Sequence, residues 1–270
     1  MLAHRLFLGL TVLVTAIALR DAWGDADRLL FYLPAVGYGV LLEQATLAFF
    51  DAYRYPTAHY LLVVGDVPVV IGVCWGAILY AGWRLGRNHA RSVLPAFVGL
   101  FALHVDFAMD AVAVRLDFWR WLTPNPLWFG VPLGNMYGWF WVAVLYAGLW
   151  TLLHDRWRWL AVLAPLAAPA VLVALLEFWT RYVAPTPAHR LLVLGGLVVG
   201  AVWVVTRHAA PVPALGVHRI PLAFHAFFLA WALVGDMPPG VVVAAALFAG
   251  VSVAWVGVPP GRLRAAVGTG

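Results

Sequence analysis

Several ionisable side chains lie inside long apolar runs of this 270-residue sequence, where a charge is costly if the surroundings are lipid. Each such group costs roughly 2.5–3.5 kcal/mol at the centre of a membrane helix, even on a lenient insertion scale. A set of them therefore marks a candidate functional site. The set comprises Glu43, Asp66, His104, Asp106, Asp110 and Glu177, while Asp51 and Asp236 lie at run edges, where water can reach them.

Asp106 and Asp110 are four residues apart, so both carboxyl groups lie on the same face of a helix. Two adjacent carboxylates in a medium of low dielectric constant resist double ionisation, and we expect one to hold a proton at neutral pH. A neutral carboxylic acid in an apolar pocket is a competent general acid. The alternative is that both carboxyl groups bond to arginine or backbone. His104 points away from Asp106, so these three residues do not form a metal site.

The elements that must position these side chains are membrane helices. The chain is 64% hydrophobic and 11% charged, far from the roughly 25% charged residues of soluble domains. Apolar runs long enough to cross a bilayer cover residues 2–19, 29–50, 60–83, 92–114, 129–153, 159–179, 191–206, 220–234 and 241–257. The eighth is short and bracketed by prolines, which favours a re-entrant or strongly tilted segment. We predict an all-α, polytopic transmembrane helix bundle of seven to nine spans, forming a single integral membrane domain over residues 1–270, with strand content near zero.

The net charge of +5 comes from arginines at the ends of apolar runs. This distribution is typical of membrane topology and headgroup anchoring, so we expect no nucleic-acid partner. With nine spans, 11 of the 17 arginines share a side with the carboxyl terminus, which the positive-inside rule places in the cytoplasm. The lone Cys74 excludes a disulfide framework and a thiolate metal site.

Small and aromatic residues surround the acidic segment. Gly130, Gly134 and Gly138 are spaced by four, which favours close helix contact, with Asn135 able to hydrogen-bond across it or to substrate or water. We interpret the tryptophans near the span ends as an interfacial belt; they are Trp119, Trp121, Trp128, Trp157, Trp159 and Trp179. Glu177 and Arg181 form an i,i+4 pair, and His225 is expected to be a hydrogen-bonded core residue.

Two stretches carry an unusual order of residues. The first runs from Asp106-Phe-Ala-Met-Asp110 through Trp119-x-Trp121 to Gly130-Val-Pro132-Leu-x-Asn135-x-x-Gly138-Trp139, and the second contains Glu43, Phe50-Asp-Ala-Tyr53-Arg-Tyr55, Val67-Pro68 and Trp75. Together they resemble the signature of carotenoid hydratases of the CruF and bisanhydrobacterioruberin hydratase type. The resemblance covers roughly residues 40–142. Asp51 stands where that family usually has glycine and Ala111 where it usually has proline, which leaves room for a divergent branch with another substrate.

The resemblance implies a multi-pass enzyme of the cell membrane, a cofactor-independent hydro-lyase that adds water across the terminal C=C of an acyclic or monocyclic carotenoid to give a tertiary alcohol. Its partners would be a carotenoid or other polyisoprenoid substrate drawn from the bilayer and membrane lipids, with other carotenoid-pathway enzymes as candidates. Asp106, Asp110 and Glu43 would supply the acid and its partners, and Asn135 would position water. The substrate-binding candidates, whose aromatic faces can stabilise a cation, are Tyr53, Tyr55, Trp75, Trp119 and Trp139. No metal or cofactor is implied.

Two other functions stay open. A membrane prenyltransferase would use the Asp106/Asp110 spacing to bind magnesium diphosphate, but such sites normally need a second acidic cluster and basic residues, which the sequence does not offer convincingly. A non-enzymatic isoprenoid or lipid carrier, or a proton-coupled transporter, would use the buried acids as relays. Inverted repeats would favour transport, and none is evident.

Overall fold

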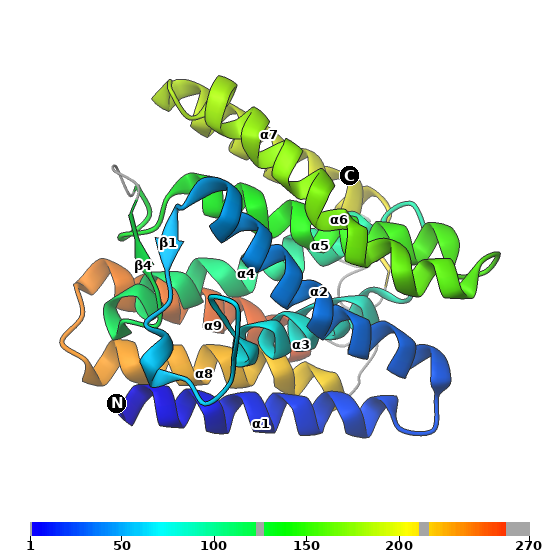
Figure 1. Cartoon of the computed structure of the whole chain (residues 1–270), viewed down its shortest axis with the longest axis horizontal. Coiled ribbons are helices and arrows are strands. Elements are labelled where there is room, and N and C mark those ends of the chain that lie inside the picture. The colour runs from blue at the N-terminus through cyan, green and yellow to red at the C-terminus, as the bar shows by residue number, and fades with distance from the viewer. Residues whose placement is uncertain (1, 123–126, 211–215, 258–270) are drawn as a thin grey trace.

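The computed structural model describes residues 2–122, 127–210 and 216–257, and within these residues the chain forms a bundle of nine α-helices (Figure 1). The helices are α1 (Leu2–Ala22), α2 (Ala26–Phe50), α3 (Val69–Gly86), α4 (Leu94–Ala113), α5 (Leu133–Leu153), α6 (Arg158–Phe178), α7 (Pro187–Arg207), α8 (Arg219–Val234) and α9 (Pro239–Gly257). Successive helices run back and forth between the two ends of the molecule. Eight helical stretches are long and apolar enough to cross a membrane. The predicted all-α, multi-pass bundle is confirmed.

Helix boundaries differ from the apolar runs mainly in the third span. This run was expected from residue 60, but α3 begins at Val69, and residues 63–68 form a small hairpin of β2 (Val63–Val64) and β3 (Val67–Pro68). Asp66 lies exposed in the turn of that hairpin, so its placement inside a span was wrong. In the eighth run, α8 continues the short helix η4 (Gly216–His218), and together they form one of the stretches long enough to span a membrane.

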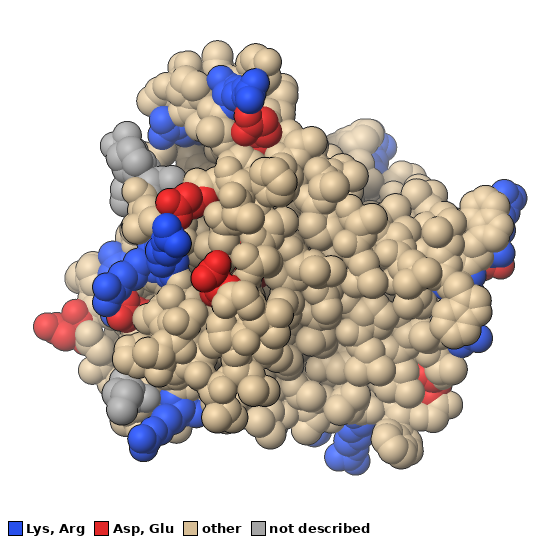
Figure 2. All heavy atoms as spheres, viewed as in Figure 1, with Lys and Arg blue, Asp and Glu red and all other residues tan. Residues whose placement is uncertain are grey.

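The surface separates charged ends from an apolar middle. Figure 2 shows acidic and basic side chains gathered mainly toward the two ends of the helices, with a broad uncharged band between them. Large hydrophobic side chains such as Leu163, Leu192 and Val243 are exposed on helices α6, α7 and α9. This is the distribution expected when lipid surrounds the bundle. The cytoplasmic location of the carboxyl terminus stays a prediction, because residues 258–270 lie outside the described residues.

Helices α2 and α3 pack unusually closely because glycines line their contact. A Cβ atom placed on Gly39 would lie 2.6 Å from Cβ of Trp75, and one on Gly72 would lie 2.7 Å from the carbonyl oxygen of Val36. Such distances leave no room for a side chain, so the two backbones can approach only with glycine at these positions. The close approach brings Trp75 of α3 beside the following turn of α2, which carries Glu43.

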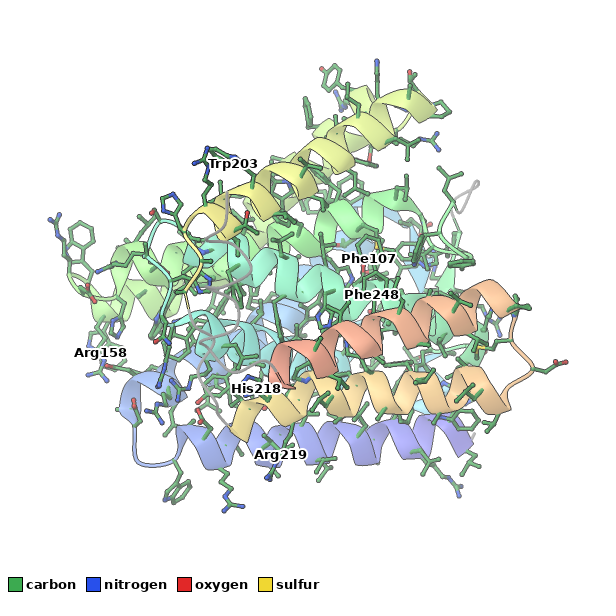
Figure 3. The ribbon with its side chains drawn as sticks, turned by 180° about the vertical axis from the view of Figure 1, so that it is seen from behind. Phe107, Arg158, Trp203, His218, Arg219 and Phe248 are labelled. Carbon is green, nitrogen blue, oxygen red and sulfur yellow. The ribbon has the colours of Figure 1, made fainter. Side chains whose placement is uncertain are left out.

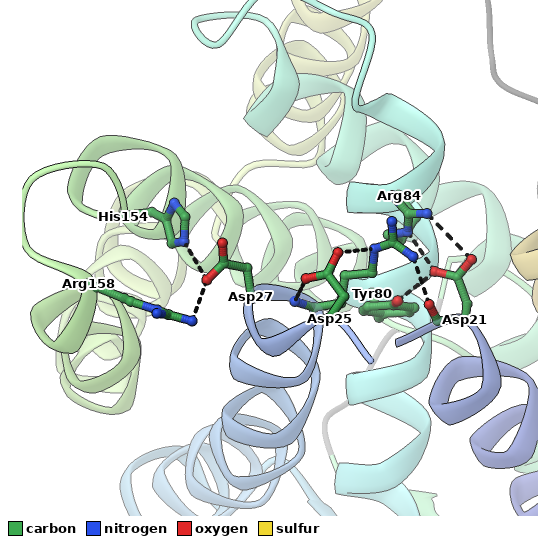
Figure 4. Close-up of polar contacts among 8 residues, drawn as sticks. Asp21, Asp25, Asp27, Tyr80, Arg84, His154 and Arg158 are labelled. Atoms are coloured by element: carbon green, nitrogen blue, oxygen red, sulfur yellow. Dashed lines mark hydrogen bonds and ion pairs between the residues drawn. The ribbon is translucent and has the colours of Figure 1, made fainter. Parts of the chain in front are cut away.

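A buried ion pair ties the arginine-rich end of the bundle together, the end that carries the α1–α2, α3–α4 and α5–α6 connections (Figure 4). Nε of Arg84 on α3 donates to Oδ2 of Asp21 on α1 at 2.6 Å, and the hydroxyl of Tyr80 donates to the same oxygen at 2.6 Å. Arg28 of α2 donates to the carbonyl oxygen of Asp21 at 2.9 Å. The first three helices are therefore joined at one point.

Helices α8 and α9 attach to α4 on the side facing away from Asp106. Nε2 of His104 lies 2.8 Å from Oγ of Ser252 and 3.0 Å from Nε2 of His225. Figure 3 shows Phe107 and Phe248 against each other; their rings stack with centroids 5.3 Å apart. The prediction of a hydrogen-bonded core histidine at position 225 is confirmed. Three more histidines are buried: His4, His89 and His218.

Candidate active site

A short strand pair joins the loops that follow α2 and α4, near the acidic residues. Strand β1 (Tyr53–Arg54), which follows α2, pairs antiparallel with β4 (Arg120–Trp121), which follows α4, so that Tyr53 faces Trp121. The chain enters β1 through Asp51, whose φ of 44° is left-handed and whose N–H caps the end of α2. Aspartate tolerates this conformation better than most residues. The departure from the glycine of the resembling family thus preserves the turn that delivers Tyr53 to the site.

Asp106 and Asp110 form a buried pair that Asn135 holds from the neighbouring helix. Their exposed fractions are 0% and 1%. Nδ2 of Asn135, in the first turn of α5, donates to Oδ2 of Asp110 at 2.6 Å and to the two carboxyl oxygens of Asp106 at 3.2 and 3.3 Å. The predicted shared helix face is confirmed. Among the described residues, no arginine contacts either carboxyl group.

The two carboxyl groups lie close together, because the same Nδ2 of Asn135 contacts both of them. A carboxylate offers only acceptors, so a bond between two carboxyl groups needs a proton on one of them. Oδ1 of Asp110 is buried and receives no donor from any other described residue. An oxygen buried in that way is costly to leave unsatisfied, and a proton shared with Asp106 removes the cost. The geometry therefore favours a pair that stores one proton.

Glu43 sits in a cage of donors at the same end of the bundle. Nε1 of Trp75 donates to its Oε1 at 2.8 Å, and the hydroxyls of Tyr53 and Tyr55 both donate to its Oε2, the latter at 2.8 Å. Burial and then the negative charge of Glu43 raise the pKa of both tyrosines well above the ordinary value, so they keep their protons and remain donors. Three donors on two oxygens suit a carboxylate anion.

A mainly apolar cavity of about 270 Å³, which we call the outer cavity, opens beside this group. It lies among α2, α5 and the end of α6, where the π-helical turn η3 (Trp179–Val183) supplies part of its wall. Its polar residues include Glu43, Asn135 and Arg190. Its lining includes Leu42, Thr46, Phe50, Trp75, Trp121, Leu133, Trp139, Leu172, Leu176 and Trp179. Such a shape and lining suit an apolar ligand with one reactive end.

A second, smaller space of about 50 Å³, the inner chamber, lies behind the same wall. Asp110 lines only this chamber, whereas six residues line both spaces: Glu43, Tyr53, Trp75, Trp121, Asn135 and Trp139. The other residues around the chamber are Phe7, Tyr55, Ile71, Cys74, Ile78, Met109 and Trp119.

The five aromatic residues predicted to bind substrate are all brought to these two spaces. The Trp75 and Trp139 rings pack with centroids 4.1 Å apart, and Tyr55 meets the edge of Trp119 at 6.2 Å. With Glu43, Asp106, Asp110 and Asn135, every site residue expected from the sequence lies in one group. Within the described residues, no three His, Cys, Asp or Glu side chains are arranged to hold a metal ion.

A comparison with known protein families shows to which family the chain belongs. The profile of the family described as carotenoid biosynthesis protein matches residues 3–203. The chain belongs to this family. Searches of curated proteins and of solved structures gave no match. The matched region holds every residue of the site, and the protein therefore has a role in carotenoid biosynthesis. Helices α8 and α9, which the family profile does not reach, contribute no residue to the lining of either space.

Several sequence interpretations of this family member need correction. Trp119 and Trp179 are buried in the site rather than in an interfacial belt, although Trp157 and Trp159 are exposed as a belt requires. Gly130 lies in a turn with φ of 103° before α5, so it is not part of a helical stripe.

Gly134 of that stripe makes a contact with Trp179 that the sequence did not predict. A Cβ atom on Gly134 would lie 2.8 Å from Nε1 of Trp179, so the glycine makes room for this indole in the cavity wall. A small residue beside Asn135 was the only sequence signal for this contact, and it did not identify the partner. The predicted Glu177–Arg181 ion pair is confirmed at the exposed end of α6.

Proposed function

We propose that this member of the carotenoid biosynthesis family is a carotenoid hydratase, a cofactor-independent hydro-lyase that acts on the terminal C=C of an acyclic or monocyclic carotenoid. The observation that carries the proposal is the buried Asp106/Asp110 pair, which is held by Asn135, a residue that also lines the aromatic, mainly apolar outer cavity. An acid in such a place can act on a substrate that is dissolved in the lipid. Hydration of an isolated alkene needs a positioned proton donor and an apolar site, and this arrangement supports both.

The reaction begins with proton transfer from the aspartate pair. The π electrons of the terminal alkene form a new C–H bond at the less substituted carbon, and the shared proton of Asp106 and Asp110 leaves its oxygen. The pair becomes fully ionised, and the adjacent carbon becomes a tertiary cation. General acid catalysis by a positioned side chain contributes typically about 10²–10⁴-fold in rate.

The cation is then stabilised and captured. The Trp75 and Trp139 faces offer cation–π attraction, and the carboxylate of Glu43 offers an opposite charge across a medium of low dielectric constant. A water molecule attacks the cation, forms the C–O bond and gives up one proton to a carboxylate. That proton returns the aspartate pair to its starting state, so each turnover consumes one alkene and one water.

The size of the outer cavity suits one end of a long polyene. At about 270 Å³ it is slightly smaller than the roughly 300–1,000 Å³ of sites that enclose a whole drug-sized ligand. A carotenoid would therefore insert its terminal isoprene units and leave the rest of the chain among the lipids. Thr180 of η3 lines this cavity and is itself exposed, which gives the substrate a lateral way in.

Expression in a lycopene-producing host tests the proposal. We expect the extracted pigment to gain the mass of one water at each reacted end, compared with cells that carry an empty vector. A carrier or transporter would leave the pigment mass unchanged. A prenyltransferase would add isoprene units and lose activity with a chelator, so either pattern would overturn the hydratase assignment.

A further inference from the structure

We propose that the inner chamber is a water-binding site that supplies the nucleophile, kept separate from the outer cavity that receives the alkene. This inference rests on the proposed hydratase function and divides its site into two compartments. Hydration needs a water molecule next to a cation that forms from a hydrocarbon. A site with a single compartment would have to bind both the water and the hydrocarbon in the same space.

The chamber has the size and the partners that a bound water requires. A space needs roughly 10–15 Å³ to admit one water, so about 50 Å³ holds on the order of three. One wall carries Glu43, Asp110 and Asn135. Another part of the wall is apolar and comes from one stripe of α3, on which Ile71, Cys74 and Ile78 follow at helical spacing. The polar wall therefore sets where water binds.

Two acceptors on that polar wall have hydrogen-bonding capacity to spare. Oδ1 of Asn135 accepts no hydrogen bond from any described residue, because its Nδ2 is the atom turned toward the aspartates. Oε1 of Glu43 accepts one bond, from Trp75, and a carboxylate oxygen can accept two. A water that donates to both oxygens would keep its lone pairs free for attack.

The same two residues form the boundary with the outer cavity. Glu43 and Asn135 line both spaces, and the packed Trp75–Trp139 pair stands between them. An alkene end that reaches this wall from the outer cavity would meet both the water of the chamber and the carboxyl group of Asp110, which lines the chamber and is bonded to Asn135. In the capture step the water oxygen forms the C–O bond, and its proton passes to Glu43 or to the ionised aspartate pair, so the charges balance.

Filling the chamber tests the division. Cys74→Leu extends a side chain of the apolar wall into the space, from a position that does not line the outer cavity. After equilibration in D₂O, purified wild-type protein should both hydrate the carotenoid and return some alkene that carries deuterium, because protonation is reversible. In Cys74→Leu we expect hydration to fall roughly tenfold or more, while deuterium still enters the recovered alkene within about twofold of the wild-type rate.

Two further variants make the result specific. Ile78→Ala, one turn along α3 from residue 74, should restore space and hydration when combined with Cys74→Leu. Val73→Leu introduces the same side chain on a half-buried face that lines neither space and should change nothing. If Cys74→Leu does not fold, Ile78→Phe fills the chamber from the same wall.

Each of the other outcomes contradicts either the assignment of the inner chamber or the proposed hydratase function. Wild-type hydration by a folded, filled variant would show that water comes from elsewhere. Loss of both hydration and deuterium incorporation would show that the chamber holds the substrate end. Wild-type protein that neither hydrates nor exchanges deuterium would overturn the hydratase proposal itself.

Discussion

At the scale of single residues, the acids of the proposed site have two different environments. Asp106 and Asp110 share one donor, the amide of Asn135, whereas three donors surround Glu43. Two carboxyl environments that differ in this way can act as acid and as counter-charge in the same reaction. Because Tyr53 and Tyr55 keep Glu43 in its role, they are positioning residues.

Tyr53→Phe and Tyr55→Phe should each slow hydration by roughly tenfold, because a hydrogen bond to a charged group contributes about 1.5–3 kcal/mol. With fewer donors, Glu43 is held less firmly as an anion beside the cation. The measurement is the initial rate per folded protein, since both variants also lose stability. Tyr60→Phe is the matched control: its hydroxyl donates to the carbonyl oxygen of Phe118 at 2.8 Å, outside the acid group. Equal rate losses in all three variants would show that the tyrosines act only through the fold.

Sequence reasoning located these residues better than it located their contacts. The i,i+4 spacing of Asp106 and Asp110 was enough to predict a shared face, because helix geometry is local. The bond from Asn135 could be assigned only with α4 and α5 packed together, and spacing alone had favoured helix packing for that residue. The donors around Glu43 could not be predicted from the sequence, because they depend on tertiary contacts. These contacts are the glycine contact between α2 and α3 and the two-residue pairing of β1 with β4.

At the scale of elements, α1, α2 and α3 depend on the ion pair at the arginine-rich end. Arg84 is 5% exposed and has Asp21 as its counter-charge. Asp21→Asn should lower the free energy of unfolding by about 3 kcal/mol, because it leaves a buried guanidinium uncompensated. Thermal unfolding in detergent measures this loss.

Asp155→Asn provides the comparison for that prediction. It breaks the pair between Arg91 and Asp155, in which both side chains are 59% exposed. Exposed pairs contribute little because water screens them, so this variant should melt close to wild type. A similar melting temperature for both variants would contradict a structural role for the Asp21–Arg84 pair.

At the scale of the whole molecule, composition and hydropathy predicted nearly all of the architecture. All nine apolar runs are helices, since a chain in lipid must satisfy its backbone bonds within each segment. The errors lay at the ends: Asp66 and Gly130 belong to turns, because apolar residues such as Val63 and Val131 continue a run past the end of its helix. The site lies at the end of the bundle that carries β1 and β4 (Figure 1), opposite the arginine-rich end. The positive-inside rule then predicts that the site lies near the non-cytoplasmic surface.

The most direct test of the account is the pigment made by Asp106→Asn and Asp110→Asn chains in a lycopene-producing host. Each change keeps the side-chain size and removes the second carboxyl group, so no proton is shared. We predict that hydrated product falls by about 10²-fold or more in both, while the exposed Asp66→Asn control matches wild type. Hydrated carotenoid at the wild-type level from both folded variants would contradict the claim that this pair donates the proton.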